Sequence, residues 1–130
     1  MKPAAEDLVA RRPVWWALSD LFLDIELDDV VYNYVARMCL ESPYSPEECA
    51  EILWREVYPI CSRNLFSMAG VWDAFEREWL ENEIIRHVST WRFRFWERWE
   101  WKQPLFGRIV LSDWHEVQKR MEAMVKMQPE

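Results

Sequence analysis

The segment from residue 78 to residue 102 constrains the fold more than any other part of the sequence. It contains five of the ten tryptophans and neither glycine nor proline. Large apolar residues recur in it every three or four positions, the spacing of one face of an α-helix: Leu80, Ile84, Val88, Trp91, Phe95 and Trp99. Further large apolar residues lie off this stripe, so the helix would be apolar on more than one side. We therefore expect a central helix over about residues 78–101, with the other helices packed around it.

The rest of the composition favours an all-α fold. The chain has 130 residues, the length of one domain, and only two glycines. Sheet proteins use glycine in their tight hairpin turns, so this scarcity disfavours a sheet. We predict a single helical domain over residues 1–130, a bundle of about five helices.

Prolines and capping residues indicate where the earlier helices begin and end. Pro13 suits the first position of a helix, where its missing N–H would have had no partner. That helix would run to about Leu23. Asp28 or Asp29 can then cap a second helix, which the apolar spacing extends to about Glu41.

The clearest local signal is the sequence from Ser45 to Glu48. Ser45 is a typical helix cap, Pro46 fits the first helical position, and Glu48 completes a capping box three residues after the serine. Pro59 should stop or kink this helix. Residues 60–73 have no steady apolar period, so we expect a packed loop there.

The region after the Trp-rich segment contains a last helix. Residues 103–111 are broken by a proline and a glycine, and Ser112 or Asp113 can cap the helix that follows. Residues 91–95 also alternate with period two, as an edge strand would. A short β-ribbon that pairs them with residues 108–111 is therefore an alternative to helix at this point.

Three cysteines form no recognisable framework. Cys39, Cys49 and Cys61 are odd in number, and their spacing fits neither a disulfide scaffold nor a zinc site. Cys61 follows a proline in the expected loop, so we expect it to be the most exposed. With no apolar signal-peptide core at the N-terminus and no run of transmembrane length, we expect a soluble, cytoplasmic protein.

Charge is unevenly distributed along the chain. The net charge is −7, but residues 1–85 carry 7 basic and 17 acidic side chains, whereas residues 86–130 carry 9 basic and 6 acidic ones. The acidic part repels nucleic acid and anionic lipid and suits a basic partner. We therefore expect a basic protein partner, with no nucleic acid and no membrane as partners.

Three stretches resemble a family of small uncharacterised bacterial proteins: residues 11–24 (RRPVWWALSDLFLD), 41–61 (ESPYSPEECAEILWREVYPIC) and 64–70 (NLFSMAG). The resemblance covers about residues 11–85 and implies no activity. In size, acidity and helical pattern the chain is also similar in type to immunity proteins that neutralise bacterial toxins.

Residues suited to catalysis are few. The two histidines, His87 and His115, are far apart in the sequence, and Glu83 lies one helical turn before His87. Such a pair is usually part of a solvated helix face, and no further Glu-x-x-His pair exists to complete a di-metal bundle. No phosphate loop, nucleophile elbow or zinc spacing occurs. We expect a non-enzymatic protein without cofactor or metal; an enzyme that uses Cys61 or the Glu83–His87 pair is the minor alternative.

Two groups of residues are candidates for contact with a partner. The first is the acidic tract between residues 20 and 56, whose carboxylates would steer a cationic protein, although many such tracts are only the solvated faces of helices. Its candidate residues are Asp20, Asp24, Glu26, Asp28, Asp29, Glu47, Glu48 and Glu51. Tyr44, in the turn beside them, would be a rigid aromatic anchor.

The second group comprises Trp96 and Trp101, which alternate with arginines. If exposed, they could stack nucleic-acid bases, lie at a lipid boundary or form a homodimer contact. Glu97 and Glu100 reduce the positive charge of this segment and so disfavour binding to nucleic acid or lipid. Our leading hypothesis is an immunity-type protein that masks a basic toxin or effector. The alternative is a self-associating regulator or adaptor that uses the Trp-rich helix.

Overall fold

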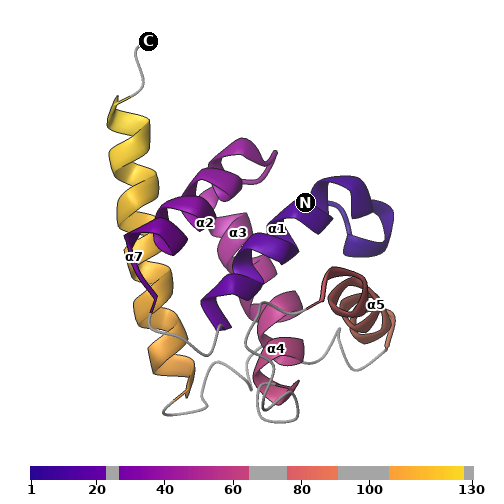
Figure 1. Cartoon of the computed structure of the whole chain (residues 1–130). Helices are drawn as coiled ribbons and strands as arrows, with labels where there is room; N and C mark the ends of the chain where they lie inside the picture. Colours follow the sequence, from indigo (N-terminus) through magenta and orange to yellow (C-terminus); the bar gives the residue numbers. More distant parts are fainter. Residues whose placement is uncertain (23–26, 65–75, 91–105, 128–130) are drawn as a thin grey trace.

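The structure is a computed structural model that describes residues 1–22, 27–64, 76–90 and 106–127 (Figure 1). Every regular element in these ranges is helical, which confirms the expected all-α fold. In chain order they are η1 (Ala4–Glu6), α1 (Leu8–Ser19), η2 (Asp20–Phe22), α2 (Asp29–Glu41), α3 (Pro46–Ile52), the π-helical turn η3 (Leu53–Val57), α4 (Tyr58–Asn64), α5 (Arg77–Val88) and α7 (Phe106–Met127).

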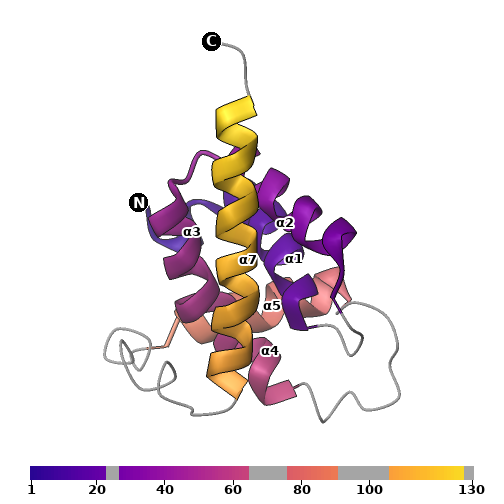
Figure 2. The same cartoon turned by 90° about the vertical axis from the view of Figure 1, so that its left-hand side faces the viewer.

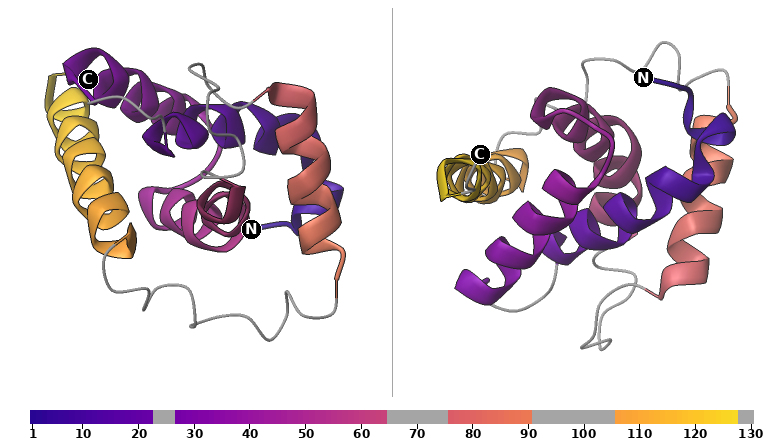
Figure 3. Two further views of the ribbon diagram at one scale, coloured as in Figure 1. Left: turned by 60° about the horizontal axis from the view of Figure 1, so that its bottom comes forward. Right: turned by 90° about the horizontal axis from the view of Figure 1, so that it is seen from above.

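The helices form a bundle in which α7 and α5 lie on opposite flanks (Figures 1 and 3). Helix α7 packs mainly against α2, and α1 packs against α2, η3 and α5. Figure 2 shows α7 in front, with α3 to one side of it and α2 to the other. The buried side chains of these helices form one hydrophobic core, which includes Trp15 of α1 and Trp114 of α7.

Helix α1 begins five residues earlier than the sequence predicts. The prediction that Pro13 starts the helix is wrong, because α1 begins at Leu8 and Pro13 lies inside it. A proline here deprives the carbonyl of Val9 of its helical donor. Val9 is 86% exposed, so water can supply that hydrogen bond.

Two predicted helix caps are confirmed. The Asp28 carboxylate accepts a hydrogen bond from the Val31 amide at 3.1 Å, and α2 ends at Glu41 as expected. At the start of α3, the Ser45 hydroxyl accepts from the Glu48 amide at 3.1 Å, and the Glu48 side chain accepts from the Ser45 amide at 2.9 Å. These reciprocal bonds complete the capping box.

Of the two outcomes expected at Pro59, a stop or a kink, the stop does not occur, because the helical chain runs on to Asn64. The turn before the proline is π-helical, and the Tyr58 amide donates to the Leu53 carbonyl five residues earlier. This wider turn relieves the clash between the proline ring and the carbonyl four residues before it. Cys61 is consequently in a helix and buried, which corrects the expectation that it is exposed.

The Trp-rich segment does not form one central helix. Helix α5 covers Arg77–Val88 on one flank of the bundle, and a turn follows at residues 89–90 (Figure 1). The Ser89 hydroxyl donates to the Ile85 carbonyl at 2.7 Å and the Thr90 hydroxyl to the His87 carbonyl at 2.8 Å. The Ile85 carbonyl also keeps its helical partner, the Ser89 amide at 3.1 Å, whereas the Thr90 amide bonds the His87 carbonyl three residues back at 3.2 Å, and the helix ends in a turn.

Residues 91–105 lie outside the described part of the chain, and with them the first half of the alternative β-ribbon. Its second half, residues 108–111, belongs to α7, so the ribbon prediction is wrong there. Helix α7 begins at Phe106, six residues before Ser112. Trp114, Val117 and Met121 are buried and form its inward face.

Candidate functional site

Five of the predicted acidic residues fall into two groups, one at each end of α2. Asp28 and Asp29 lie at its beginning, whereas Glu47, Glu48 and Glu51 lie on α3, which follows its end. With 13 residues, α2 is roughly 20 Å long, so the groups are separated by about that length. Four further predicted residues lie outside the described residues: Asp24, Glu26, Trp96 and Trp101.

The charges at the beginning of α2 already have partners. The Asp28 carboxylate caps α2, and that of Asp29 forms an ion pair with Arg120 of α7. The guanidinium of Arg120 also pairs with Glu116 at 2.9 Å and lies 4.9 Å from the centre of the Tyr32 ring. This end of the predicted surface therefore holds α2 and α7 together.

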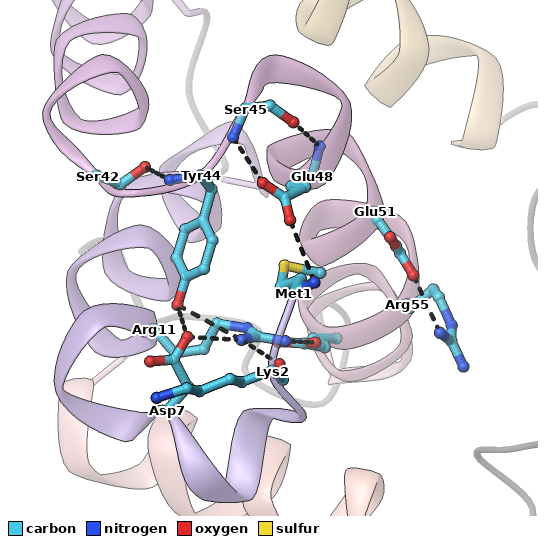
Figure 4. Close-up of polar contacts among 11 residues, drawn as sticks. Met1, Lys2, Asp7, Arg11, Ser42, Tyr44, Ser45, Glu48, Glu51 and Arg55 are labelled. Atoms are coloured by element: carbon cyan, nitrogen blue, oxygen red, sulfur yellow. Dashed lines mark hydrogen bonds and ion pairs between the residues drawn. The ribbon is translucent and has the colours of Figure 1, made fainter.

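The acidic residues of α3 form a second, more open group, which we call the acidic edge: Glu47, Glu48 and Glu51. The Glu48 side chain completes the capping box and lies 3.5 Å from the α-amino group of Met1, and its hydrogen bond to the Ser45 backbone lowers the pKa of Glu48 (Figure 4). Glu51 is exposed and pairs with Arg55 at 3.2 Å. Glu47 is exposed and forms no ion pair with the other described residues.

Asp20 lies apart from both groups, at the C-terminal end of α1. Its side chain is partly buried, and this burial raises the pKa of Asp20 to about 6, against the opposing charge of Arg77. A carboxylate that is partly removed from water and faces a cation within its own chain is poorly placed to steer a partner.

Tyr44 is not the exposed anchor that the sequence suggests. Only 9% of it is exposed, and the guanidinium of Arg11 lies 5.2 Å from the centre of its ring. The Tyr44 hydroxyl donates to the Asp7 carboxylate and accepts from Arg11 at 3.4 Å (Figure 4). Burial and the bond to Asp7 raise the pKa of Tyr44 to about 12. The ring therefore stabilises the fold.

A groove of about 330 Å³ lies beside the acidic edge, between α7 and the corner that joins α2 to α3. We call it the α3–α7 groove. It is lined by Leu40, Pro46, Glu47, Gln118, Met121, Glu122, Val125 and Lys126. Glu47 lies on one wall and Glu122 on the other. Val125 is 53% exposed, so the groove offers apolar surface flanked by carboxylates.

The most extensive buried polar cluster was not predicted. Arg11 of α1 and Glu56 of η3 are 2% and 4% exposed, and two 3.1 Å hydrogen bonds join the guanidinium to the carboxylate. The indole N–H of Trp15 donates to the same carboxylate at 2.8 Å. A local signal existed: Arg11 lies four residues before Trp15, and Glu56 lies four residues after Ile52, so each charge occupies a buried helical stripe.

The charges and hydrogen-bonding groups of this cluster find their partners inside the protein. The remaining guanidinium nitrogen of Arg11 donates to the Lys2 carbonyl at 2.9 Å and to the Asp7 carboxylate at 3.1 Å. Burial alone would lower the pKa of Arg11, but the hydrogen bonds and charge of Glu56 outweigh it and raise that pKa. With every charge paired, the cluster is suited to fixing the fold.

Comparison with known proteins places the chain in a family. Residues 9–120 match the family described as a domain of unknown function, DUF7079. The chain belongs to this family. The DUF7079 match includes most of the chain after residue 85, where the sequence resemblance ended. Neither a curated protein nor a solved structure matches the chain.

Two of the residues considered for catalysis in this DUF7079 domain are either paired within the chain or buried. Glu83 pairs with Arg86 at 3.3 Å. The Cys61 thiol is wholly buried, which raises its pKa well above the ordinary value. Among the described residues, no cluster of three or more potential metal ligands occurs. A separate finding concerns membranes: none of the described helices is both long and apolar enough to span one.

Proposed function

We propose that this protein is a non-enzymatic binding module that masks a basic protein partner, as an immunity protein masks a bacterial toxin or effector. One observation carries the proposal. Glu47 and Glu51 are exposed carboxylates one helical turn apart on α3, and Glu47 also lines the apolar α3–α7 groove. The sequence resemblance to bacterial proteins supports a bacterial origin of the protein and its partner, and the three free cysteines fit a reducing cytoplasm.

The proposed mechanism has two steps. The carboxylates of the acidic edge attract the cationic surface of the partner, and opposed fields of this kind can raise association rates about 10- to 1000-fold. Leu40, Pro46 and Val125 then offer apolar surface in the groove next to the point of first contact. Burial of apolar side chains there would slow dissociation.

The buried polar cluster is itself poorly suited to catalysis. Active sites usually hold titratable groups whose charge is only partly compensated, so that they can act on a substrate. Arg11 and Glu56 instead compensate each other and hydrogen-bond further partners inside the fold.

Affinity capture from a native bacterial extract tests the proposal. The protein, immobilised at low ionic strength, should retain a protein of net positive charge, and a moderate increase in salt should release it. A variant with Glu47→Lys and Glu51→Lys should retain much less of the same protein. Recovery of no basic protein, or equal recovery by both, would contradict the proposal.

A further inference from the structure

Helix α7 carries a polar and apolar stripe on a side that its own chain leaves accessible. The stripe recurs at intervals of four, three, four and three residues, which places its members on one helix face: Leu111, His115, Gln118, Glu122 and Val125. Leu111 is 40% and Val125 is 53% exposed, and both His115 and Glu122 are exposed. We call these five residues the α7 stripe.

The order of side-chain types along the α7 stripe is the same in both directions, except that the basic and the acidic residue change places. An apolar residue stands at each end, an amide at the centre, and a basic and an acidic side chain between them. If a second α7 lies antiparallel across Gln118, Leu111 meets Val125 of the other copy, and His115 meets Glu122 of the other copy. A two-fold interface requires such self-complementarity, because each contact occurs twice.

The ion pairs of α7 support a contact at this face. Glu116 pairs with Lys119 at 3.2 Å and with Arg120 at 2.9 Å, and these residues lie off the stripe. Among the described residues, neither His115 nor Glu122 forms an ion pair. The stripe thus has one potential cation and one anion that another copy can neutralise.

The α3–α7 groove provides room for the second copy. Gln118, Glu122 and Val125 of the stripe form its α7 wall, and Leu40 and Pro46 lie opposite. An antiparallel second helix would bring its Leu111 beside Val125, at this groove. Burial of both apolar ends removes from water the two exposed large side chains of the stripe.

We infer that α7 is the interface of a homodimer in which two copies of the chain pack antiparallel about Gln118. The contact extends over 15 residues of helix, roughly 21 Å, which is small for a protein interface. The dimer should therefore dissociate in the micromolar range. The inference does not rest on the proposed basic partner, but both contacts use the α3–α7 groove, so a second copy and the partner would compete for it.

Sedimentation equilibrium of the full chain over a wide concentration range tests the inference. The wild-type protein should be a reversible dimer, and Leu111→Asp or Val125→Asp should each shift it to monomer. Val9→Asp, which replaces an exposed apolar residue on α1, should leave the association unchanged. A monomer at every concentration, or a dimer that Val125→Asp does not weaken, would overturn the inference.

A charge exchange distinguishes a direct contact from an indirect effect on folding. One variant carries His115→Lys and Glu122→Lys, and the other carries His115→Glu and keeps Glu122. Each should be monomeric alone, because like charges meet in its dimer. An equimolar mixture should form a heterodimer, since every charge then meets its opposite. Failure of the mixture to associate would overturn the antiparallel register.

Discussion

Arg11 and Glu56 are 45 positions apart in the sequence and are joined by two 3.1 Å hydrogen bonds inside the core. The guanidinium and carboxylate are both almost fully buried, so each is the main compensation for the other's charge. This pair connects α1 to the π-helical turn η3. It therefore fixes how the N-terminal helix lies on the α3–α4 segment that carries the acidic edge.

Loss of this pair should be costly to the fold. Replacement of Glu56 by glutamine leaves a buried guanidinium without its main counter-charge, and breaking such a pair costs about 3–5 kcal/mol. We expect Glu56→Gln to lower the free energy of unfolding by about that amount in urea denaturation. Glu51→Gln, which breaks the exposed pair with Arg55, should cost less than about 1 kcal/mol. Equal losses in the two variants would contradict the structural role assigned to Glu56.

The capping box at the start of α3 should make a measurable contribution. Ser45→Ala removes the acceptor of the Glu48 amide, and loss of a helix cap costs about 0.5–2 kcal/mol. Urea denaturation should show a decrease in this range. Ser112→Ala, at an exposed position within α7, is the matched control and should change stability by less than about 0.5 kcal/mol.

Asp20 should make stability depend on pH between about 4 and 6. Burial raises the pKa of Asp20 in the folded protein to about 6 from the ordinary 3.8, so the folded state binds the proton more tightly. The stability due to this group is therefore present at low pH and is lost as pH rises through this range. The loss is at most about 3 kcal/mol.

Comparison with Asp20→Asn isolates this contribution. Unfolding midpoints in urea, measured from pH 4 to pH 7, should fall more steeply with rising pH in the wild type than in the variant. Parallel profiles would show that the Asp20 carboxyl titrates alike in the folded and unfolded chains, against the burial described above.

The three thiols should be unreactive in the native state. Cys39, Cys49 and Cys61 are all completely buried, and burial raises the pKa of Cys61. We expect a disulfide reagent of the dithiobis-nitrobenzoate type to modify them only at the rate at which the protein unfolds. Rapid modification of Cys61 in the folded protein would instead restore it as a candidate nucleophile.

Local features of the fold could be predicted from the sequence, because they depend on neighbouring residues. Ser45 and Glu48 are close in the chain, and so are Asp28 and the amide that it caps. The prediction that a helix starts at Pro13 failed, and Pro59 does not stop its helix, because the surroundings of each proline decided the outcome. Helix α1 accommodates Pro13 beside an exposed turn, and the π-helical turn accommodates Pro59.

Local sequence patterns could not predict the features of the candidate site that depend on contacts between distant parts of the chain. Glu47 was predicted as a surface carboxylate, but the groove beside it joins α2, α3 and α7, which are distant in the sequence. Tyr44 was misassigned because its burial depends on Arg11 of another helix. The length of the Trp-rich helix was overestimated because apolar spacing gives no sign of the turn that Ser89 and Thr90 form after α5.

The most direct test of the central claim is the association rate of the captured basic partner as a function of ionic strength. Three proteins are compared: the wild type, Glu47→Lys/Glu51→Lys at the acidic edge, and Glu78→Lys/Glu83→Lys on α5, which changes net charge equally. If the acidic edge receives the partner, its reversal slows association at low salt by about 10-fold or more and flattens the salt dependence, while the α5 reversal has a much smaller effect. Equal effects of the two reversals, or none from either, would contradict the claim.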